Sequence, residues 1–132
     1  MQEKDSLDSI TRRIIGAAIE VHRALGPGLL ESAYEACLAY ELIRRGFEVK
    51  QQLALPVQYE NVKLDCGYRV DILVDDKVII EVKAVEGLAP IHQAQVLSYL
   101  KMSGLRVGLL INFNVTTLTK GLKRIVNEFP DS

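Results

Sequence analysis

The chain lacks several features that would place it in a common class at once. Its 16 Lys and Arg nearly balance its 17 Asp and Glu, so the net charge of -1 shows none of the basic excess of a general nucleic-acid binder. No apolar run reaches the roughly 18 residues that a membrane-spanning helix needs, and no signal-peptide pattern opens the chain. We therefore expect a cytoplasmic protein without a membrane segment, in which any binding of nucleic acid is local.

Cysteine and histidine are also scarce. Cys37 and Cys66 show no paired metal-ligand spacing and fall in segments that read as helix and strand. We therefore expect two reduced, packed thiols and no disulfide. His22 and His92 are too far from a second Cys or His to indicate a zinc site. We expect His22 to be a helix histidine with a satisfied hydrogen bond, whereas His92 is a candidate for touching substrate.

The chain reads as one undivided domain. It contains no internal repeat, low-complexity tract or linker. Its 132 residues, 48% of them apolar, are enough for one ordinary globular core and too few for two. We therefore treat residues 1–132 as a single domain.

Two helices are predicted ahead of the first strand. Apolar residues recur at helical spacing from Ile10 to Leu25, polar residues just before Ile10 offer cap oxygens, and Gly26-Pro27-Gly28 ends the segment. A second stripe runs from Leu30 to Leu42 and ends at Arg44-Arg45-Gly46. A turn joins the two.

Strand-like alternation follows. Residues 47–55 predict a strand that Pro56 interrupts or bends and that residues 57–59 continue, and residues 64–74 predict one long second strand. After a turn at 75–77, residues 78–85 are apolar on both faces apart from two charged positions, as is typical of a central strand. The short turn favours a meander.

The last third of the chain predicts a helix and a further strand. Residues 91–102 consist mostly of buried residue types and end at Gly104, so they predict a third helix. Residues 107–113 predict a buried strand, parallel to a neighbour because a helix connects them. Residues 118–129 fit either a short helix or an edge strand, and we favour the strand.

Three charged residues, Asp71, Glu81 and Lys83, interrupt the apolar strand sequence. A buried charge costs several kcal/mol unless it is paired, metal-bound or neutral. Glu81 and Lys83 are two apart and project from the same face, and the turn at 75–77 can bring Asp71 beside Glu81. Two carboxylates aimed at one point suit Mg²⁺, which prefers oxygen ligands and could also take the backbone carbonyl of Val82.

Such a site suits phosphodiester hydrolysis. The ion would polarise the phosphoryl oxygen and lower the pKa of a bound water, while Lys83 would orient or deprotonate that water. A structural ion-pair cluster is the alternative, because chance produces many Asp and Glu-x-Lys combinations.

Three segments carry a resemblance to known proteins. Asp71 followed by Glu81-Val82-Lys83 resembles the motif of the PD-(D/E)XK nuclease superfamily. Gly28-Leu29-Leu30-Glu31-Ser32-Ala33-Tyr34 resembles the signature of the GxxExxY protein family, a branch of that superfamily. Gln95-Val96-Leu97-Ser98-Tyr99 resembles the QxxxY element of RecB-like nucleases. With residues 20–28 and 108–126, the resemblance extends over nearly the whole chain.

The resemblance implies both a fold and a set of roles. The fold would be α/β, a restriction-endonuclease-like three-layer sandwich with a mixed β-sheet flanked by helices and an α-β-β-β-α-β core. The cofactor would be Mg²⁺ or Mn²⁺. The resemblance does not imply a known substrate, and our own expectation is a nucleic-acid partner, with DNA favoured over RNA. The catalytic set would be Glu31, Asp71, Glu81 and Lys83. The metal ligands would be Glu31, Asp71, Glu81 and Val82, and the supporting or substrate-binding residues would be Gln95, Tyr99 and His92.

Plainer explanations stay open beside these roles. Glu31 could be a solvated residue favoured by the helix dipole, Gln95 a buried amide bonded to backbone, and Tyr34 and Tyr99 core aromatics. The basic groups at 12–13, at 44–45 and at 120 with 123–124 would bind phosphates only if they converged on the site. The whole protein could be a non-catalytic regulatory module that binds nucleic acid or a partner protein. A homodimer is compatible with either function.

Overall fold

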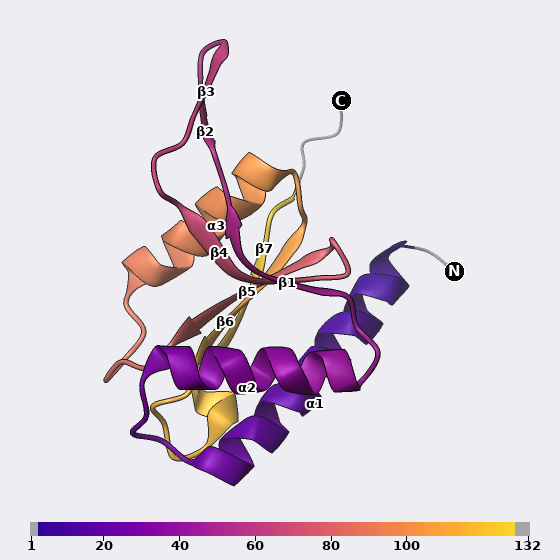
Figure 1. Ribbon diagram of the computed structural model, residues 1–132, viewed down its shortest axis with the longest axis vertical. Helices are drawn as coiled ribbons and strands as arrows, with labels where there is room; N and C mark the ends of the chain where they lie inside the picture. Colours follow the sequence, from indigo (N-terminus) through magenta and orange to yellow (C-terminus); the bar gives the residue numbers. More distant parts are fainter. Residues whose placement is uncertain (1–2, 129–132) are drawn as a thin grey trace.

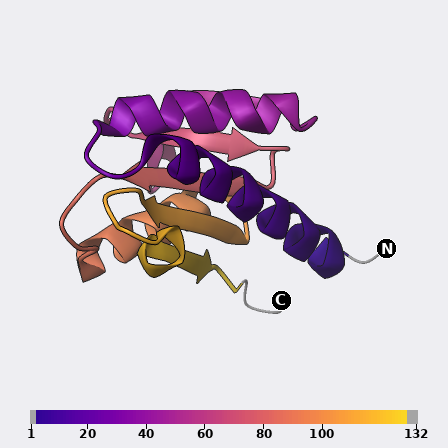
Figure 2. The same cartoon turned by 90° about the horizontal axis from the view of Figure 1, so that it is seen from below.

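In the computed structural model, which describes residues 3–128, one mixed sheet lies between helices on both of its faces (Figures 1 and 2). The strand order in this five-stranded sheet is β1-β4-β5-β6-β7, and β2 and β3 form a separate two-stranded hairpin. The elements in chain order are α1 (Glu3–Leu25), α2 (Glu31–Arg44), β1 (Val49–Ala54), β2 (Val57–Tyr59), β3 (Val62–Leu64), β4 (Arg69–Val74), β5 (Val78–Lys83), α3 (Pro90–Ser103), β6 (Val107–Asn112), the 3-10 turn η1 (Leu118–Gly121) and β7 (Leu122–Val126).

The pairing of the strands confirms the predicted mixed sheet. β1 and β5 both run antiparallel to β4, and β7 runs antiparallel to β6. β5 and β6 are parallel, because α3 carries the chain back across the sheet between them. The order of helices and strands and the three layers are those predicted.

Each face of the sheet packs on its own hydrophobic cluster. Helices α1 and α2 cover one face, where Ile14 and Leu38 meet Ile80, and α3 covers the other, where Leu100 meets Ile79 (Figure 2). Alternate residues of a strand point to opposite faces. Glu81 therefore lies on the α3 face of β5, together with Ile79.

The first helix is longer than predicted. It begins at Glu3 rather than at Ile10, because buried Leu7 extends the apolar stripe by one turn. The ends of α2 and α3 agree with the sequence prediction. Within residues 3–128, no helix combines the length and the apolar character needed to span a membrane.

The two long strands predicted around Pro56 are each divided. After Pro56, β2 leaves the main sheet and pairs only with β3, so the β2–β3 hairpin projects away from the sheet (Figure 1). The predicted strand at 64–74 is broken at 65–68, where Gly67 has a φ of 83° and donates its N–H to Asp65 Oδ1 at 3.0 Å. Proline removes a ladder donor, and this side-chain-to-backbone bond competes with strand pairing.

Two further predictions concerned burial and the chain end. Cys37 and Cys66 are free thiols as predicted, but both are exposed, because Cys37 lies off the buried stripe of α2 and Cys66 lies in the 65–68 break.

Residues 122–126 form a strand, as favoured, after a 3-10 turn. Phe129, the end of that ambiguous segment, lies outside the described residues.

Gly121 leaves no room for a side chain. A Cβ at this position would overlap the backbone carbonyl oxygen of Asn112, which cannot rotate away. We expect Gly121→Ala to lower the free energy of unfolding by about 1–3 kcal/mol, since the backbone of η1 or β6 must move. Gly87→Ala is the matched control, because its Cβ would meet none of the described residues within 4 Å. Equal urea midpoints for the two variants would contradict this packing.

Candidate functional site

Asp71 and Glu81 lie where the ladder between β4 and β5 stops. The last paired residues are Ile72 and Ile80. Beyond them, the Asp71 N–H donates to Glu81 Oε1 at 3.1 Å, and the Val82 N–H donates to Asp71 Oδ2 at 2.8 Å. In a regular ladder, a backbone carbonyl of the neighbouring strand would accept each of these N–H groups. Here a side-chain carboxylate of the neighbouring strand accepts each one, and the two bonds together hold both acids at one point.

The ladder is also interrupted on the β1 side. Gln51 pairs with Ile72 and Leu53 with Val70, but Gln52, between them, does not pair with Asp71. Gln52 has a φ of 51°, a left-handed conformation that costs a residue with a side chain about 1–3 kcal/mol. The strand therefore bends at the residue that faces the acids.

The bend lets Gln52 join two acids. Its Nε2 donates to Asp71 Oδ1 at 3.2 Å and to Glu35 Oε1 at 2.8 Å. The Gln51 amide donates to the other Glu35 oxygen at 3.0 Å. Sequence reasoning missed Glu35 and Gln52. The only available signal for Glu35 was its position four residues after Glu31, on the same helix face.

Glu81 is one of the few buried ionisable side chains, with 4% of its surface exposed. Burial, and next the neighbouring Asp71 carboxylate, raise its pKa from 4.5 to about 8. The charge of Lys83 acts in the opposite direction but does not offset them. Without a further positive charge, Glu81 is therefore largely protonated at neutral pH.

Helix α3 brings a second group of predicted residues to the acids. The Gln95 Nε2 donates to the Tyr99 hydroxyl at 2.9 Å, so this amide binds a side chain and not backbone. Burial, and next the charge of Glu81, raise the pKa of Tyr99. Tyr99 packs in one cluster with Val70 and Ile79, which are strand neighbours of Asp71 and Glu81. His92 Nδ1 accepts the Ala89 N–H, while the His92 N–H donates to the Ala89 carbonyl, both at 2.9 Å. This pair of bonds caps α3, which gives His92 a structural role.

Glu31 is the first residue of α2 and is exposed. The beginning of α2 lies on the same side of the molecule as the end of β5 (Figure 1). However, among the residues that the structure describes, no three Asp, Glu, His or Cys side chains are close enough to hold a metal ion together. The acids that the structure brings together are Asp71 and Glu81, with Glu35 linked through Gln52, and the role of Glu31 stays a prediction.

Tyr34, from the same segment as Glu31, is a core residue. Its ring is fully buried and stacks on Phe113 with the centroids 4.6 Å apart. Its hydroxyl accepts the Leu29 N–H at 3.0 Å and donates to the Gly26 carbonyl at 2.6 Å. Tyr34 therefore fixes the turn between α1 and α2. His22 is a helix histidine with a hydrogen-bond partner, as predicted: it is buried, and its Nε2 lies 2.7 Å from the Val115 carbonyl.

The donor set suits a hard divalent cation. Asp71 and Glu81 offer carboxyl oxygens at one partly enclosed point, and a bound cation would favour the charged form of Glu81 that burial disfavours. Mg²⁺ typically binds one or two carboxylates and keeps several waters, so two acids are sufficient. The amide of Val82 is already used by Asp71, and a role for its carbonyl stays a prediction.

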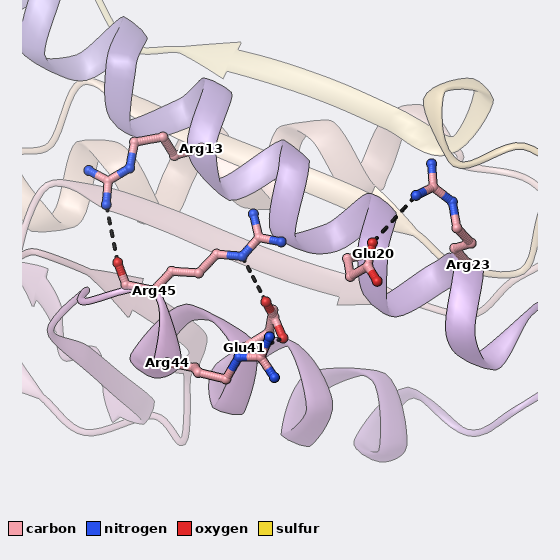
Figure 3. Close-up of polar contacts among 6 residues, drawn as sticks. All are labelled: Arg13, Glu20, Arg23, Glu41, Arg44 and Arg45. Atoms are coloured by element: carbon pink, nitrogen blue, oxygen red, sulfur yellow. Dashed lines mark hydrogen bonds and ion pairs between the residues drawn. The ribbon is translucent and has the colours of Figure 1, made fainter.

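The arginines of the helical layer do not converge on these acids. Arg13 of α1 lies 4.1 Å above the Phe47 ring and donates to the Arg45 carbonyl at 3.3 Å (Figure 3). Arg44 and Arg45 both pair with Glu41, at 3.9 and 2.7 Å (Figure 3). The Arg13 bond joins α1 to the end of α2, and these contacts lie at the opposite end of that helix from Glu31. Elsewhere, Arg124 pairs with Asp8 at 2.8 Å.

The raised pKa of Glu81 predicts a pH dependence of stability. Between pH 4.5 and about 8 the folded state keeps a proton on Glu81 that the unfolded chain has lost. The free energy of unfolding of the metal-free protein should therefore fall, by on the order of a few kcal/mol, as the pH rises through this interval. Glu81→Gln keeps the acceptor for the Asp71 N–H but removes this linkage, so its stability should vary less with pH. Glu60→Gln, an exposed control, should follow the wild type. Parallel curves for Glu81→Gln and wild type in EDTA would contradict the assignment.

The contacts of Gln52 predict an effect of charge. Gln52→Glu would place a third carboxylate between Glu35 and Asp71 and remove the donor they share. We expect the free energy of unfolding at neutral pH to fall by about 1–3 kcal/mol. The loss should shrink at low pH, where the acids are protonated. Gln58→Glu, which is exposed in the hairpin, supplies the same charge change away from the acids. Equal thermal midpoints for the two variants at neutral pH would refute the bridging role.

Comparison with known proteins gives one result. A family model of the PD-(D/E)XK nuclease superfamily matches residues 8–125, a span that includes Glu35, Asp71, Glu81 and Lys83. Searches of curated proteins and of solved structures found no match. The mixed five-stranded sheet with helices on both faces is consistent with the restriction-endonuclease-like fold that we predicted. The chain belongs to the PD-(D/E)XK nuclease superfamily.

Proposed function

We propose that the protein is a Mg²⁺- or Mn²⁺-dependent nuclease that hydrolyses phosphodiester bonds, with DNA favoured over RNA as substrate. The observation that carries this proposal is the reciprocal bonding of Asp71 and Glu81 at the break in the sheet. That arrangement places two carboxyl groups together, and a divalent cation bound there would favour the charged form of Glu81, which burial and Asp71 disfavour. Membership of a nuclease superfamily supports the same chemistry.

The residues divide into three roles under this proposal. Asp71 and Glu81, with the Val82 carbonyl, would hold the ion, and Glu31 would bind it through water. When bound, the ion would supply polarisation of the phosphoryl oxygen and a more acidic water. Lys83, two residues after Glu81 and on the same face, would orient that water and stabilise the charge that develops on the phosphate.

The other residues support or extend the centre. Gln52 would hold Asp71 in position from the β1 side, with Glu35 behind it. Gln95, Tyr99 and His92 would form the α3 wall along which the substrate lies.

Finer assignments belong to the same proposal. The segment from Gly28 to Tyr34 supports the GxxExxY branch of the superfamily. A cytoplasmic location is proposed because polynucleotide substrates are available there. A homodimer would allow two centres to act on the two strands of a duplex.

A non-catalytic module that binds nucleic acid or a partner protein is the second candidate. It is favoured by one observation: within residues 7–128, the acids are not already gathered into a group of three that could hold a metal.

A cleavage screen tests the nuclease. Purified protein should cleave single- or double-stranded DNA or RNA with Mg²⁺ or Mn²⁺ and stop in EDTA. Asp71→Ala and Lys83→Ala should each reduce the rate by about 10²–10⁴-fold. Asp76→Ala is the matched control, because Asp76 forms an exposed ion pair with Lys50 in the turn between β4 and β5.

The screen also decides between the two candidates. Cleavage that persists in Asp71→Ala comes from a contaminant and rejects the nuclease. Binding of nucleic acid without turnover by folded wild-type protein, with either metal present, selects the binding module.

A further inference from the structure

A groove runs between α3 and the base of the β2–β3 hairpin. It has a volume of about 710 Å³, within the range of about 300–1,000 Å³ that is typical of ligand sites. A neighbouring hollow of about 310 Å³ shares two of its lining residues and continues it along the hairpin. The groove is lined in part by Tyr68, Ile91, Tyr99, Lys101 and Met102, and the hollow in part by Lys63.

The groove exposes three large side chains, of which Ile91 and Met102 belong to the helix that was predicted from buried residue types. Ile91 is 70% exposed, Tyr68 43% and Met102 36%. Val96 and Leu100 take the opposite, buried side of α3, where they pack on the sheet. Leaving apolar groups of this size in water on one face is unfavourable, so such a patch indicates a binding surface.

Two tyrosines form one end of the groove. The Tyr68 ring meets the Tyr99 ring edge-on, with the centroids 5.9 Å apart and the planes at 65°. Tyr68 is fixed because its carbonyl accepts the Leu55 N–H at 3.0 Å and Arg69 Nη1 at 2.8 Å. Tyr99 lines the groove and also packs in one hydrophobic cluster with Val70, which precedes Asp71 in β4, and with Ile79, which shares a face of β5 with Glu81. The groove therefore leads to the candidate centre.

Two lysines form the other end. Lys101 lines both hollows, and Lys63 reaches the second one from β3. Neither lysine has an ion-pair partner among the residues that the structure describes. The groove thus offers aromatic and apolar surface near the acids and unpaired positive charge farther along.

We propose that this groove binds an unpaired stretch of nucleic acid, and that a single strand is the substrate class of the centre. Bases would stack on Tyr68 and pack against Ile91 and Met102, while Lys101 and Lys63 would contact phosphates. A duplex hides the faces of its bases within its own stack and could not use the aromatic end. The inference rests on the proposed function, because it takes the acids at the end of the groove as the site of cleavage.

Binding without cleavage tests the inference. Fluorescence anisotropy in EDTA would compare a labelled single-stranded oligothymidine with the same strand paired to oligoadenosine. We expect the single strand to bind more tightly. Tyr68→Ala should weaken that binding by about 5- to 100-fold, as the loss of one stacked base does. Lys101→Ala should reduce the slope of log affinity against log salt by about 0.7.

Matched variants separate stacking from structure. Tyr68→Phe keeps the ring and should bind like wild type. Tyr40→Ala removes an exposed tyrosine from α2, and Lys77→Ala removes an exposed lysine from the turn after β4, so both should leave binding unchanged. Circular dichroism would show that each variant is folded.

Several results would overturn the inference: no binding of the single strand, equal affinity for duplex and single strand, or unchanged binding by Tyr68→Ala. Its failure is separable from that of the proposed function. Cleavage confined to duplex and indifferent to Tyr68→Ala would reject the groove and keep the nuclease. Single-strand binding that depends on Tyr68, in a protein that cleaves nothing, would reject the nuclease and keep the groove.

Discussion

The structure depends on one constraint, which is that two carboxylates, Asp71 and Glu81, share a single point inside a sheet. Two acids in such a place repel one another and lose hydration, so each needs donors close by. The two strands supply them with their own backbone amides, at 3.1 and 2.8 Å, and give up regular pairing to do so. The gap in the ladder is therefore a consequence of the acids.

The rest of the fold compensates for that local loss of pairing. On one side, the backbone of Gln52 is in a left-handed conformation, and its side-chain amide donates to Asp71. The same amide donates to Glu35, so Gln52 connects Asp71 to α2. On the other, β5 stays paired with β6 along its whole length, and Asn112 fixes the segment that follows it. The Asn112 amide is buried, accepts the Val85 N–H at 3.1 Å and donates to the Val85 carbonyl at 2.9 Å. Contacts from β1, β6 and the segment after β5 thus surround Asp71 and Glu81, where the pairing between β4 and β5 is incomplete.

The errors of the sequence-based prediction share a cause. Periodicity located the helices and the central strands, but it did not show that residues after Pro56 leave the sheet, because an alternating strand looks the same in a separate hairpin. The exposure of Ile91 and Met102 was missed for a related reason. An apolar residue on α3 is buried only if another element covers that side, and the hairpin that stands beside it leaves a groove instead.

The sequence by itself determined which residues could form the centre. Alternation along a strand puts Glu81 and Lys83 on one face, and the three-residue turn brings Asp71 to Glu81, because both relations are local. Only the tertiary structure decided that Glu35 and Gln52 join these acids, since they come from a helix and an edge strand whose meeting depends on packing. It also decided that Tyr68 meets Tyr99, a contact across 31 residues of chain that no local pattern encodes.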